Sequence, residues 1–500
     1  MRPHRLALPS KHCLEIAFCT IVVGAFLASC NKGVAEEAPP RIPRAEAFLG
    51  IHFDFHAGPD CTQVGARTTP EMVETIIDKV HPDFIQIDCK GHPGYSSYPT
   101  KVGNPAPGFV GDPLVVWREV TRRRGVSLFM HYSGVLDGRA VELHPEWAAV
   151  QANGKPHQRA TSVFGPYVDE LMIPQLRELA ENYGVDGVWV DGDCWGAVPD
   201  YRERVVKMFC EQTGATAAPK GPGDPYWFEW LEFNREGFRR YLRHYVDAMK
   251  VSHPQFQVIS NWAFSDHMPE PVSAGVVALS GDFAPDDSVN SARFAGRCIE
   301  NQGMPWDLMS WSFSRKTRQQ KPAAQLKQEA AVVLAMGGGY QAYFRQDRDG
   351  AVKDLTQMDT MADVAAFCRA RQPFCHRSKA VPQVALLYST AGHYRASNRL
   401  FHWSEPHVGV LRQALTAILR ENYGVQIVSE HHVRGNMARW SVIVIPGWDY
   451  LEPAFREELV RYAESGGRLI LIGNGPAALF QKELAAAAEG ASPYFVIDEA

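Results

Sequence analysis

Short, nearly continuous apolar segments alternate with amphipathic segments along most of the chain. Eight of the apolar segments are rich in Val, Ile, Leu or aromatic residues, as strands covered on both faces should be. They span 48–55, 84–89, 126–132, 187–191, 256–260, 276–281, 307–312 and 340–344. Helical patterns lie between them, for example over 168–182 and 228–250. Eight such units over about 330 residues predict a (β/α)8 barrel of the TIM type.

A doubly wound sheet would use the same alternation, but no Gly-rich phosphate-binding turn follows the first expected strand. From Gln383 the pattern restarts as a separate, flavodoxin-like α/β unit. Its expected strands and helices are 384–388, 410–421, 425–428, 442–446, 453–465 and 468–472. The last residues, 496–500, show no obvious closing element, which leaves open whether the natural protein continues beyond Ala500.

The N-terminus carries the pattern of an export signal. Basic residues precede an apolar run over 16–28 that is too short to span a bilayer. The run ends in Leu27-Ala28-Ser29-Cys30, which resembles the bacterial lipobox, whose cysteine is acylated and becomes the new N-terminus. The alternative is an ordinary signal peptide with a chance cysteine. We therefore expect a protein of the bacterial cell envelope, lipid-anchored after export on the periplasmic or outer-surface side.

The expected domain organisation follows from these patterns. A lipoprotein signal peptide covers 1–30 and a flexible, Pro-containing tether covers 31–46. A catalytic barrel covers 47–378, and a second, non-catalytic domain covers 380–500.

Composition and cysteine spacing exclude several classes of function. Apolar residues make up 45% of the chain and charged residues 21%, which is typical of a globular protein with a large core. The net charge of -5 comes without a dense basic stripe, so nucleic acid is not an expected partner. No CxxC pair and no histidine cluster with ligand spacing occurs, and we expect no metal and no organic cofactor.

Chemistry in a barrel of this type lies at the carboxyl ends of the strands. Several expected strands end there in carboxylates, histidines and tryptophans, which is typical of a sugar site. In such a site carboxylates do the acid/base work and aromatic rings stack on the sugar. The candidate substrate-binding residues are His52, Asp54, His56, Lys90, His92, Tyr95, His131, Trp189, Asn261, Trp262 and Trp306.

Three segments resemble the family 29 α-L-fucosidases. Residues 90–101, KGHPGYSSYPTK, are similar to the family's Lys-His-His-Asp-Gly-Phe segment with its trailing aromatic-Pro-Ser/Thr-Lys. Arg124-Gly125-Val126 and His131-Tyr132-Ser133 are similar to the third βα unit with its Tyr-Tyr-Ser ending. Residues 167–191 resemble the helix and strand that carry the nucleophile. The segments keep the family's order and spacing over about residues 47–195, a combination more specific than any one motif.

The resemblance implies roles for two residues and marks three departures. Asp191 matches the catalytic nucleophile, and His92 matches the second sugar-binding histidine. Gly91 stands where the family has its first histidine, and Pro93 stands in place of an aspartate. The first expected strand ends in DFHAG at 54–58 where the family shows His-Trp-Gly. A lost histidine removes one hydrogen bond to the sugar.

The sequence offers a second catalytic carboxylate, Asp282, at the end of the sixth expected strand. We expect it to act as general acid/base, because related barrels place that group there. Structural roles stay open for both carboxylates, since Asp191 could cap a helix and Asp282 a turn. Asp286 and Asp287 are the alternative partners of Asp191. Lys90 could pair with Asp88 instead of contacting substrate.

The expected function is a retaining exo-glycosidase, α-L-fucosidase-like, that releases a terminal sugar from oligo- or polysaccharides by double displacement. A β-galactosidase-like enzyme is an alternative, because the second domain resembles the amidotransferase-like trimerisation domains that follow such barrels. That chemistry would use Glu after the fourth and seventh strands, but Asp191 and Asp307 stand there and 305–312 contains no Glu. A catalytically inactive, carbohydrate-binding lipoprotein is the third reading. No cysteine lies beyond Cys375, so we expect the second domain to serve homo-oligomer assembly.

Overall fold

The structure is a computed structural model that describes residues 39–352, 354–402, 406–486 and 492–498. The expected signal peptide, its lipobox Cys30 and the first half of the tether lie outside the described residues. In the described part of the chain, no helix has both the length and the apolar character needed to cross a membrane.

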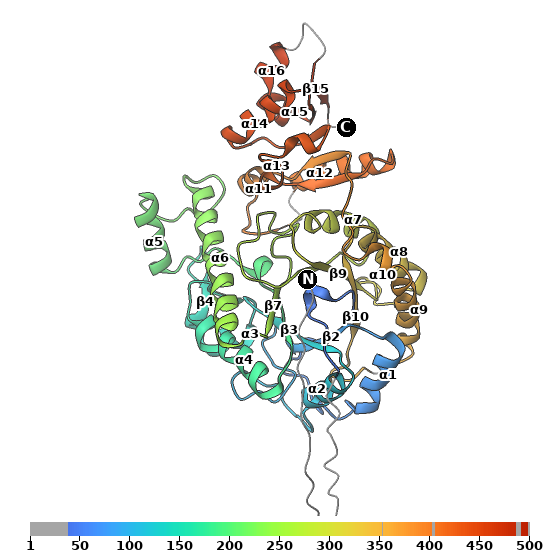
Figure 1. The fold of residues 1–500 in the computed structure, drawn as a ribbon. Helices are drawn as coiled ribbons and strands as arrows, with labels where there is room; N and C mark the ends of the chain where they lie inside the picture. The colour runs from blue at the N-terminus through green and yellow to red at the C-terminus, as the bar shows by residue number, and fades with distance from the viewer. Residues whose placement is uncertain (1–38, 353, 403–405, 487–491, 499–500) are drawn as a thin grey trace, which may run out of the picture. The chain divides into compact units, whose positions relative to one another are not determined.

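Eight parallel strands form one sheet that nearly closes on itself (Figure 1). They are β1 (Leu49–Asp54), β2 (Phe84–Lys90), β3 (Ser127–Ser133), β6 (Gly187–Asp191), β7 (Gln257–Ser260), β8 (Leu279–Asp282), β9 (Trp306–Trp311) and β10 (Gly339–Arg345). Their order is β7-β6-β3-β2-β1-β10-β9-β8. A parallel backbone bridge between Asn261 and Ser280 connects the two outermost strands. The predicted (β/α)8 barrel is confirmed, and each expected strand overlaps an observed one.

Helices cover the outer face of this sheet, so its strands are buried on both sides. Every residue of β1, β2, β3 and β6 is buried, which explains their continuous apolar sequences. The main covering helices are α1 (Pro70–Val80), α2 (Pro113–Arg123), α4 (Ile173–Glu178), α6 (Trp227–Ser252), α7 (Ser288–Ile299), α8 (Ala323–Ala335) and α9 (Gln357–Arg369). Single π-helical turns, η3 (Val168–Met172) and η4 (Leu179–Tyr183), extend α4 on both sides.

Local sequence signals fix where several helices begin. Thr69 and Asp112 precede α1 and α2, and each side chain accepts a hydrogen bond from a backbone N–H of the first turn. Proline follows each of these caps, at a position where a missing N–H costs nothing. The remaining elements of the barrel are η1 (Arg44–Glu46), α3 (Gly138–Leu143), η2 (Pro145–Trp147), the hairpin β4 (Ala148–Val150) and β5 (Pro156–Thr161), η5 (Cys194–Gly196), α5 (Glu203–Thr213) and α10 (Gln372–Cys375).

A second, five-stranded parallel sheet follows. Its strands are β11 (Val384–Leu387), β12 (Val425–Val428), β13 (Val442–Pro446), β14 (Arg468–Ile472) and β15 (Tyr494–Ile497). The order β12-β11-β13-β14-β15 is the 2-1-3-4-5 order of flavodoxin-like sheets, so the predicted α/β class is confirmed. Its helices are α11 (Thr390–Ala396), α12 (Pro406–Arg420), α13 (Glu430–Val433), η6 (Met437–Arg439), α14 (Pro453–Glu464), α15 (Asn474–Leu479) and α16 (Gln481–Ala486). The expectation of no closing element was wrong, because β15 pairs with β14 as the edge strand.

A segment of the second domain that follows β11 contributes to the core of the barrel. Tyr394, Leu400 and Phe401 belong to the same hydrophobic cluster as the barrel strands and helices. Arg235 of α6 is fully buried and donates hydrogen bonds to the carbonyls of residues 394, 399 and 400. The segment 394–401, which leads from α11 towards α12 within the second domain, therefore also stabilises the barrel.

Candidate active site

The carboxyl ends of four barrel strands bring the candidate catalytic residues together. Asp191 is the last residue of β6 and Asp282 is the last residue of β8. Asn261 follows β7 directly, and His131 lies near the end of β3. Parallel strands all end on one side of the barrel, so these side chains converge on one region.

Asp191 accepts hydrogen bonds on both carboxylate oxygens. Its Oδ1 accepts from Asn261 Nδ2 at 2.9 Å and from Trp195 Nε1 at 3.1 Å, and its Oδ2 lies 3.3 Å from His131 Nε2. Burial alone would raise the pKa of Asp191, but the hydrogen bonds from His131 and Asn261 and the nearby imidazoles lower it well below its usual range. The carboxylate is therefore ionised and has the character of a nucleophile.

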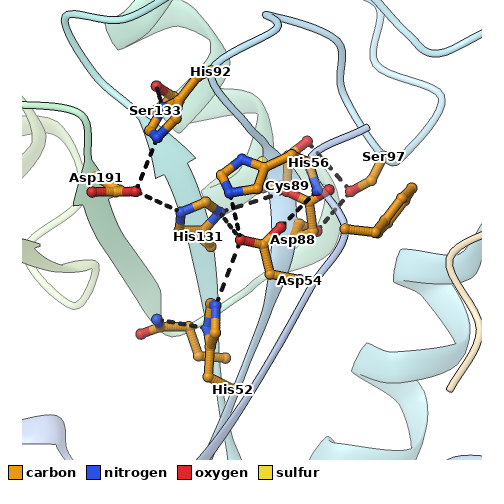
Figure 2. Close-up of polar contacts among 12 residues, drawn as sticks. His52, Asp54, His56, Asp88, Cys89, His92, Ser97, His131, Ser133 and Asp191 are labelled. Carbon is orange, nitrogen blue, oxygen red and sulfur yellow. Dashed lines mark hydrogen bonds and ion pairs between the residues drawn. The ribbon is translucent and has the colours of Figure 1, made fainter. Parts of the chain in front are cut away.

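His92 and His131 approach the same oxygen of Asp191 but differ in charge. His92 Nε2 lies 3.4 Å from Asp191 Oδ2, and its Nδ1 is hydrogen-bonded to Ser133 Oγ at 2.7 Å (Figure 2). Burial lowers the pKa of His92 to about 4, which makes this ring neutral near pH 7. Burial also opposes charge on His131, but the nearby carboxylates of Asp54, Asp191 and Asp88 raise its pKa well above the usual value. Of the two histidines, His131 is therefore the one whose charged form the surrounding carboxylates favour.

Asp282 lies close to Asp191 and has the opposite protonation tendency. Its Oδ2 accepts from Trp311 Nε1 at 2.8 Å, and its Oδ1 lies 3.4 Å from Asn261 Nδ2. Asn261 Nδ2 contacts both carboxylates, so their Oδ1 atoms can be separated by no more than the sum of the two contacts, about 6.3 Å. Burial and the charge of Asp191 raise the pKa of Asp282 to about 7.

Aromatic side chains border this pair of carboxylates. Trp195 lies against His92 and Trp262, with ring centroids 5.3 and 6.0 Å apart. Trp262 stacks on His267 at 4.3 Å and donates its Nε1–H to the carbonyl of Asp282. A cavity of about 300 Å³ adjoins Asp282 here, and Trp262, His267, Arg315 and His402 line it. The cavity offers room for a ring beside the group with the raised pKa.

A second cluster of side chains lies on the far side of His131. Asp54, His56 and His131 each present one ligand atom, and the three atoms lie within 4.8 Å of one another, so these residues could hold a metal ion. Asp54 Oδ2 is 3.1 Å from His56 Nε2 and 3.5 Å from His131 Nδ1. Asp88 Oδ1 lies 3.6 Å from the same nitrogen of His131. Figure 2 shows the His131 ring between this cluster and Asp191.

The structure connects two of the departures from the fucosidase pattern. A Cβ atom on residue 91 would lie 2.3 Å from His56 Nδ1 and 2.8 Å from His56 Cα. Position 91 must therefore be glycine for His56 to lie where it does. The imidazole that the family pattern places at residue 91 is absent, and an imidazole from the end of β1 occupies the adjoining space.

Three of the expected substrate-binding residues have side chains that lie away from the cavity. Lys90 is buried and its Nζ binds Asp137 Oδ2 at 2.5 Å, so it neither contacts substrate nor pairs with Asp88. Trp306 is the first residue of β9 and therefore lies at the amino end of the barrel, where it covers Gly338. Trp189 is 1% exposed and packs in the barrel interior.

Other expected residues lie behind the surface of the site. His52 is 1% exposed, accepts a hydrogen bond from Gln86 and faces Asp54, so it supports the cluster from below. Asp54 and His131 are likewise buried. Tyr95 packs on a separate small cluster that contains Phe55. Of the expected substrate-binding residues, His56, His92 and Trp262 keep partly exposed side chains near the carboxylates, and Asn261 holds the two carboxylates from within.

Three residues of the site were missed. Trp195 binds Asp191, Ser133 fixes His92, and Trp311 binds Asp282. Trp195 follows Asp191 by four residues in the turn η5, and Trp311 ends β9, so their positions after strands were the available signal. The glycine at 192 has φ +57, and a Cβ there would lie 3.0 Å from the His92 ring. This glycine allows the close approach of His92 to the end of β6.

Comparisons with known proteins agree with this fold. The family model Alpha-L-fucosidase matches residues 70–369. A comparison with curated proteins finds no match.

Among solved structures, the chain is similar to α-L-fucosidase isoenzyme 2 from Paenibacillus thiaminolyticus, with a TM-score of 0.70 and 18% sequence identity. The match covers 85% of this chain and 64% of that chain. It is also similar to β-galactosidases from Halorubrum lacusprofundi (TM-score 0.64, 12% identity, 85% and 72% covered) and Bacillus circulans sp. alkalophilus (0.63, 12%, 85% and 71%). At these identities the likeness shows the fold alone. The chain spans somewhat less than two thirds of the Paenibacillus protein.

Proposed function

Because the chain belongs to the alpha-L-fucosidase family of glycoside hydrolases, we propose that it is a retaining exo-glycosidase that releases a terminal fucose-like sugar from oligo- or polysaccharides. The observation that carries the proposal is the pair Asp191 and Asp282, bridged by Asn261 Nδ2. Retaining enzymes use two carboxyl groups about 5–5.5 Å apart, one ionised and one protonated. The upper limit on the oxygen separation and the opposite pKa shifts support this pairing.

In the first step Asp191 Oδ2 or Oδ1 attacks the anomeric carbon, and the bond to the leaving oxygen breaks. Asp282 transfers its proton to that oxygen, so the product leaves as an alcohol and a glycosyl ester of Asp191 remains. In the second step Asp282, now a carboxylate, takes a proton from water as the water attacks the anomeric carbon and the ester bond from that carbon to Asp191 breaks. The sugar is released with its original configuration, and both carboxyl groups return to their starting states.

The leaving group has a defined place in this mechanism. Asp282 must reach the leaving oxygen, so the part of the substrate beyond that oxygen lies in the cavity beside Asp282. Trp262 and His267 form a flat, stacked pair on its wall, which suits the face of a sugar ring. The sugar that is released lies on the other side of Asp282, against His92 and Trp195.

A panel of aryl glycosides tests the proposal. Hydrolysis of an aryl α-L-fucoside with initial release of the α-anomer, seen by NMR, supports a retaining fucosidase-like enzyme. Hydrolysis of β-galactosides alone would replace it with the β-galactosidase-like alternative. Binding of sugars without hydrolysis of any glycoside would instead identify a carbohydrate-binding protein.

We further propose that the enzyme acts in the bacterial cell envelope, anchored to a membrane by a lipid on Cys30, and that the second domain supports assembly into homo-oligomers. The apolar run that ends in Leu27-Ala28-Ser29-Cys30 supports the anchor. No cysteine occurs in the second domain to act as a nucleophile, which supports a structural role. The mass of the purified protein in solution tests the assembly, and a pure monomer would contradict it.

A further inference from the structure

We propose that Asp54, His56 and His131 bind a divalent transition-metal ion, with zinc as the best-fitting probe. The three ligand atoms are Asp54 Oδ2, His56 Nε2 and His131 Nδ1, from the ends of β1 and β3. The site is distinct from the Asp191–Asp282 pair. It does not depend on the proposed hydrolysis.

Two of the three separations of the ligand atoms match those around one ion, and the third, between the His56 and His131 nitrogens, is within 4.8 Å. Zinc binds imidazole nitrogen and carboxylate oxygen at about 2.0–2.2 Å, which places neighbouring tetrahedral ligands roughly 3.3–3.5 Å apart. The observed separations from Asp54 Oδ2 are 3.1 Å to His56 and 3.5 Å to His131. Two imidazoles and one carboxylate form a donor set that zinc and similar borderline ions accept, with a fourth position left for water or substrate.

Orphaned polar atoms point to an absent cation. His131 Nδ1 and Asp88 Oδ1 are buried and have no hydrogen-bond partner, although they lie 3.6 Å apart. In the described part of the chain, the ion pairs of Asp54 and Asp88 are with histidines. The neighbouring cation on β2, Lys90, binds Asp137 instead. Buried carboxylates that lack a lysine or arginine partner are characteristic of metal sites.

The surroundings hold the ligands in orientations that suit a metal. The backbone N–H of His56 donates to Asp54 Oδ1 at 2.7 Å, which leaves Oδ2 for the ion. The backbone N–H of Ala57 orients Asp88 in the same way. With the metal on Nδ1, His131 carries its proton on Nε2 and donates it to Asp191. A metal-binding histidine usually donates its other N–H to a carboxylate, and Asp191 is such a partner.

An entry path exists on the side of His56. The side chains of Asp54 and His131 are 3% and 2% exposed, but that of His56 is 35% exposed. His52 does not compete for the ion, because Gln86 donates to its Nδ1 and leaves the N–H on the nitrogen that faces Asp54. The sequence carried no ligand spacing for this site, since its residues come from two strands that meet only in the fold.

Zinc titration of the purified, chelator-treated protein tests the proposal. Calorimetry should show one tight site per chain, and zinc should raise the unfolding temperature. Asp54→Asn and His56→Gln should each weaken binding by more than about 100-fold, beyond the loss caused by a supporting hydrogen bond. The matched control is His92→Gln, whose ring lies 4.8 Å from that of His56 but outside the ligand set. A second control is His431→Gln. It disrupts the neighbouring pair His431 and His432 of the second domain, which could bind zinc weakly.

Several results would overturn the proposal. One is the absence of a stoichiometric zinc site in the wild-type protein. Another is an equal affinity for zinc in Asp54→Asn, His56→Gln and the control variants. If the ligand variants do not fold, X-ray absorption spectroscopy of the zinc-loaded wild type tests the site instead. A spectrum with two imidazole ligands supports the site, and a spectrum with no imidazole ligand refutes it. Aryl fucoside hydrolysis is measured on the same samples. Zinc binding without hydrolysis refutes only the proposed function, and hydrolysis by a protein with no zinc site refutes only the metal.

Discussion

Replacing Asp282 by asparagine removes the proposed acid/base while keeping the size of the side chain. The raised pKa gives the expected magnitude: at pH 6 a carboxyl with a pKa of about 7 is roughly nine-tenths protonated, whereas one at 3.8 would be under roughly one per cent protonated. The environment of Asp282 therefore supplies roughly 100-fold more of the acid form near pH 6. General acid catalysis contributes roughly 10²–10⁴-fold to such reactions. We expect kcat/KM of Asp282→Asn to fall by that factor on a substrate with a poor leaving group.

The dependence on leaving group and pH separates this role from a structural one. An aryl glycoside with an acidic phenol needs no protonation, so its cleavage step should lose far less activity in the variant than that of an alkyl glycoside. The wild-type activity should fall as the pH rises through about 7, because Asp282 loses the proton it must donate. That alkaline limb should be absent in Asp282→Asn. Steady-state kinetics over pH 4–9 with the two substrates measures both effects.

Asp286 provides the matched control, since it is exposed and its carboxylate binds Ser314 on the surface. Asp286→Asn should behave as wild type. Equal losses on both substrates, or an alkaline limb that persists in Asp282→Asn, would show that Asp282 is not the acid. If Asp286→Asn or Asp287→Asn instead lost activity on the poor leaving group and lost the alkaline limb, that residue would be the general acid.

The remaining predictions concern the nucleophile, the glycine at 91, the buried arginine and the anchor. Asp191→Ala should abolish turnover while circular dichroism and the unfolding temperature stay near wild type; appreciable turnover would exclude it as nucleophile. Gly91→Ala should lower stability by about 1–3 kcal/mol, because its Cβ meets His56; an unchanged midpoint of denaturant unfolding would contradict the close packing. Arg235→Ala should cost about 2–5 kcal/mol by the same assay, because three buried carbonyls lose their donor; a loss below about 1 kcal/mol would show that water replaces it. Cys30→Ala should remain unacylated and leave the membrane fraction; unchanged fractionation and lipid labelling would place the anchor elsewhere.

The fold was predictable because its strands are buried on both faces. Their apolar segments are continuous, and they recur at the spacing of βα units, so the eight barrel strands could be read from the sequence. The strand β15 lacks this signal. It has only four residues, and three of them are about half exposed. Its role depends on pairing with β14, which is a property of the assembled sheet.

The sequence predicted the site residues whose positions follow from the ends of strands. It did not predict the residues whose roles depend on the direction of the side chain. Asp191, Asn261 and Asp282 end or directly follow their strands, so their positions followed from the order of elements. Lys90 was misplaced because the pairing of β2 with β3 shifts between Asp88 and Lys90. This bulge turns Lys90 toward Tyr132 and the outer helices instead of the barrel interior. A single residue added to a strand reverses the side of every residue after it, and the sequence alone does not show it.

The departures from the fucosidase pattern gather on one side of the site. Asp54, His56 and Gly91 adjoin one another through the packing of His56 over residue 91, whereas Asp191, Asn261 and Asp282 lie on the other side of His131. His131 connects the two sides, with one ring nitrogen toward each. Changes confined to one side leave the geometry of nucleophile and acid intact while altering the partly exposed His56, whose ring lies beside that of the expected sugar-binding residue His92. We therefore expect the reaction to remain retaining, and the choice of sugar, rather than the mechanism, to be what separates this protein from the rest of its family.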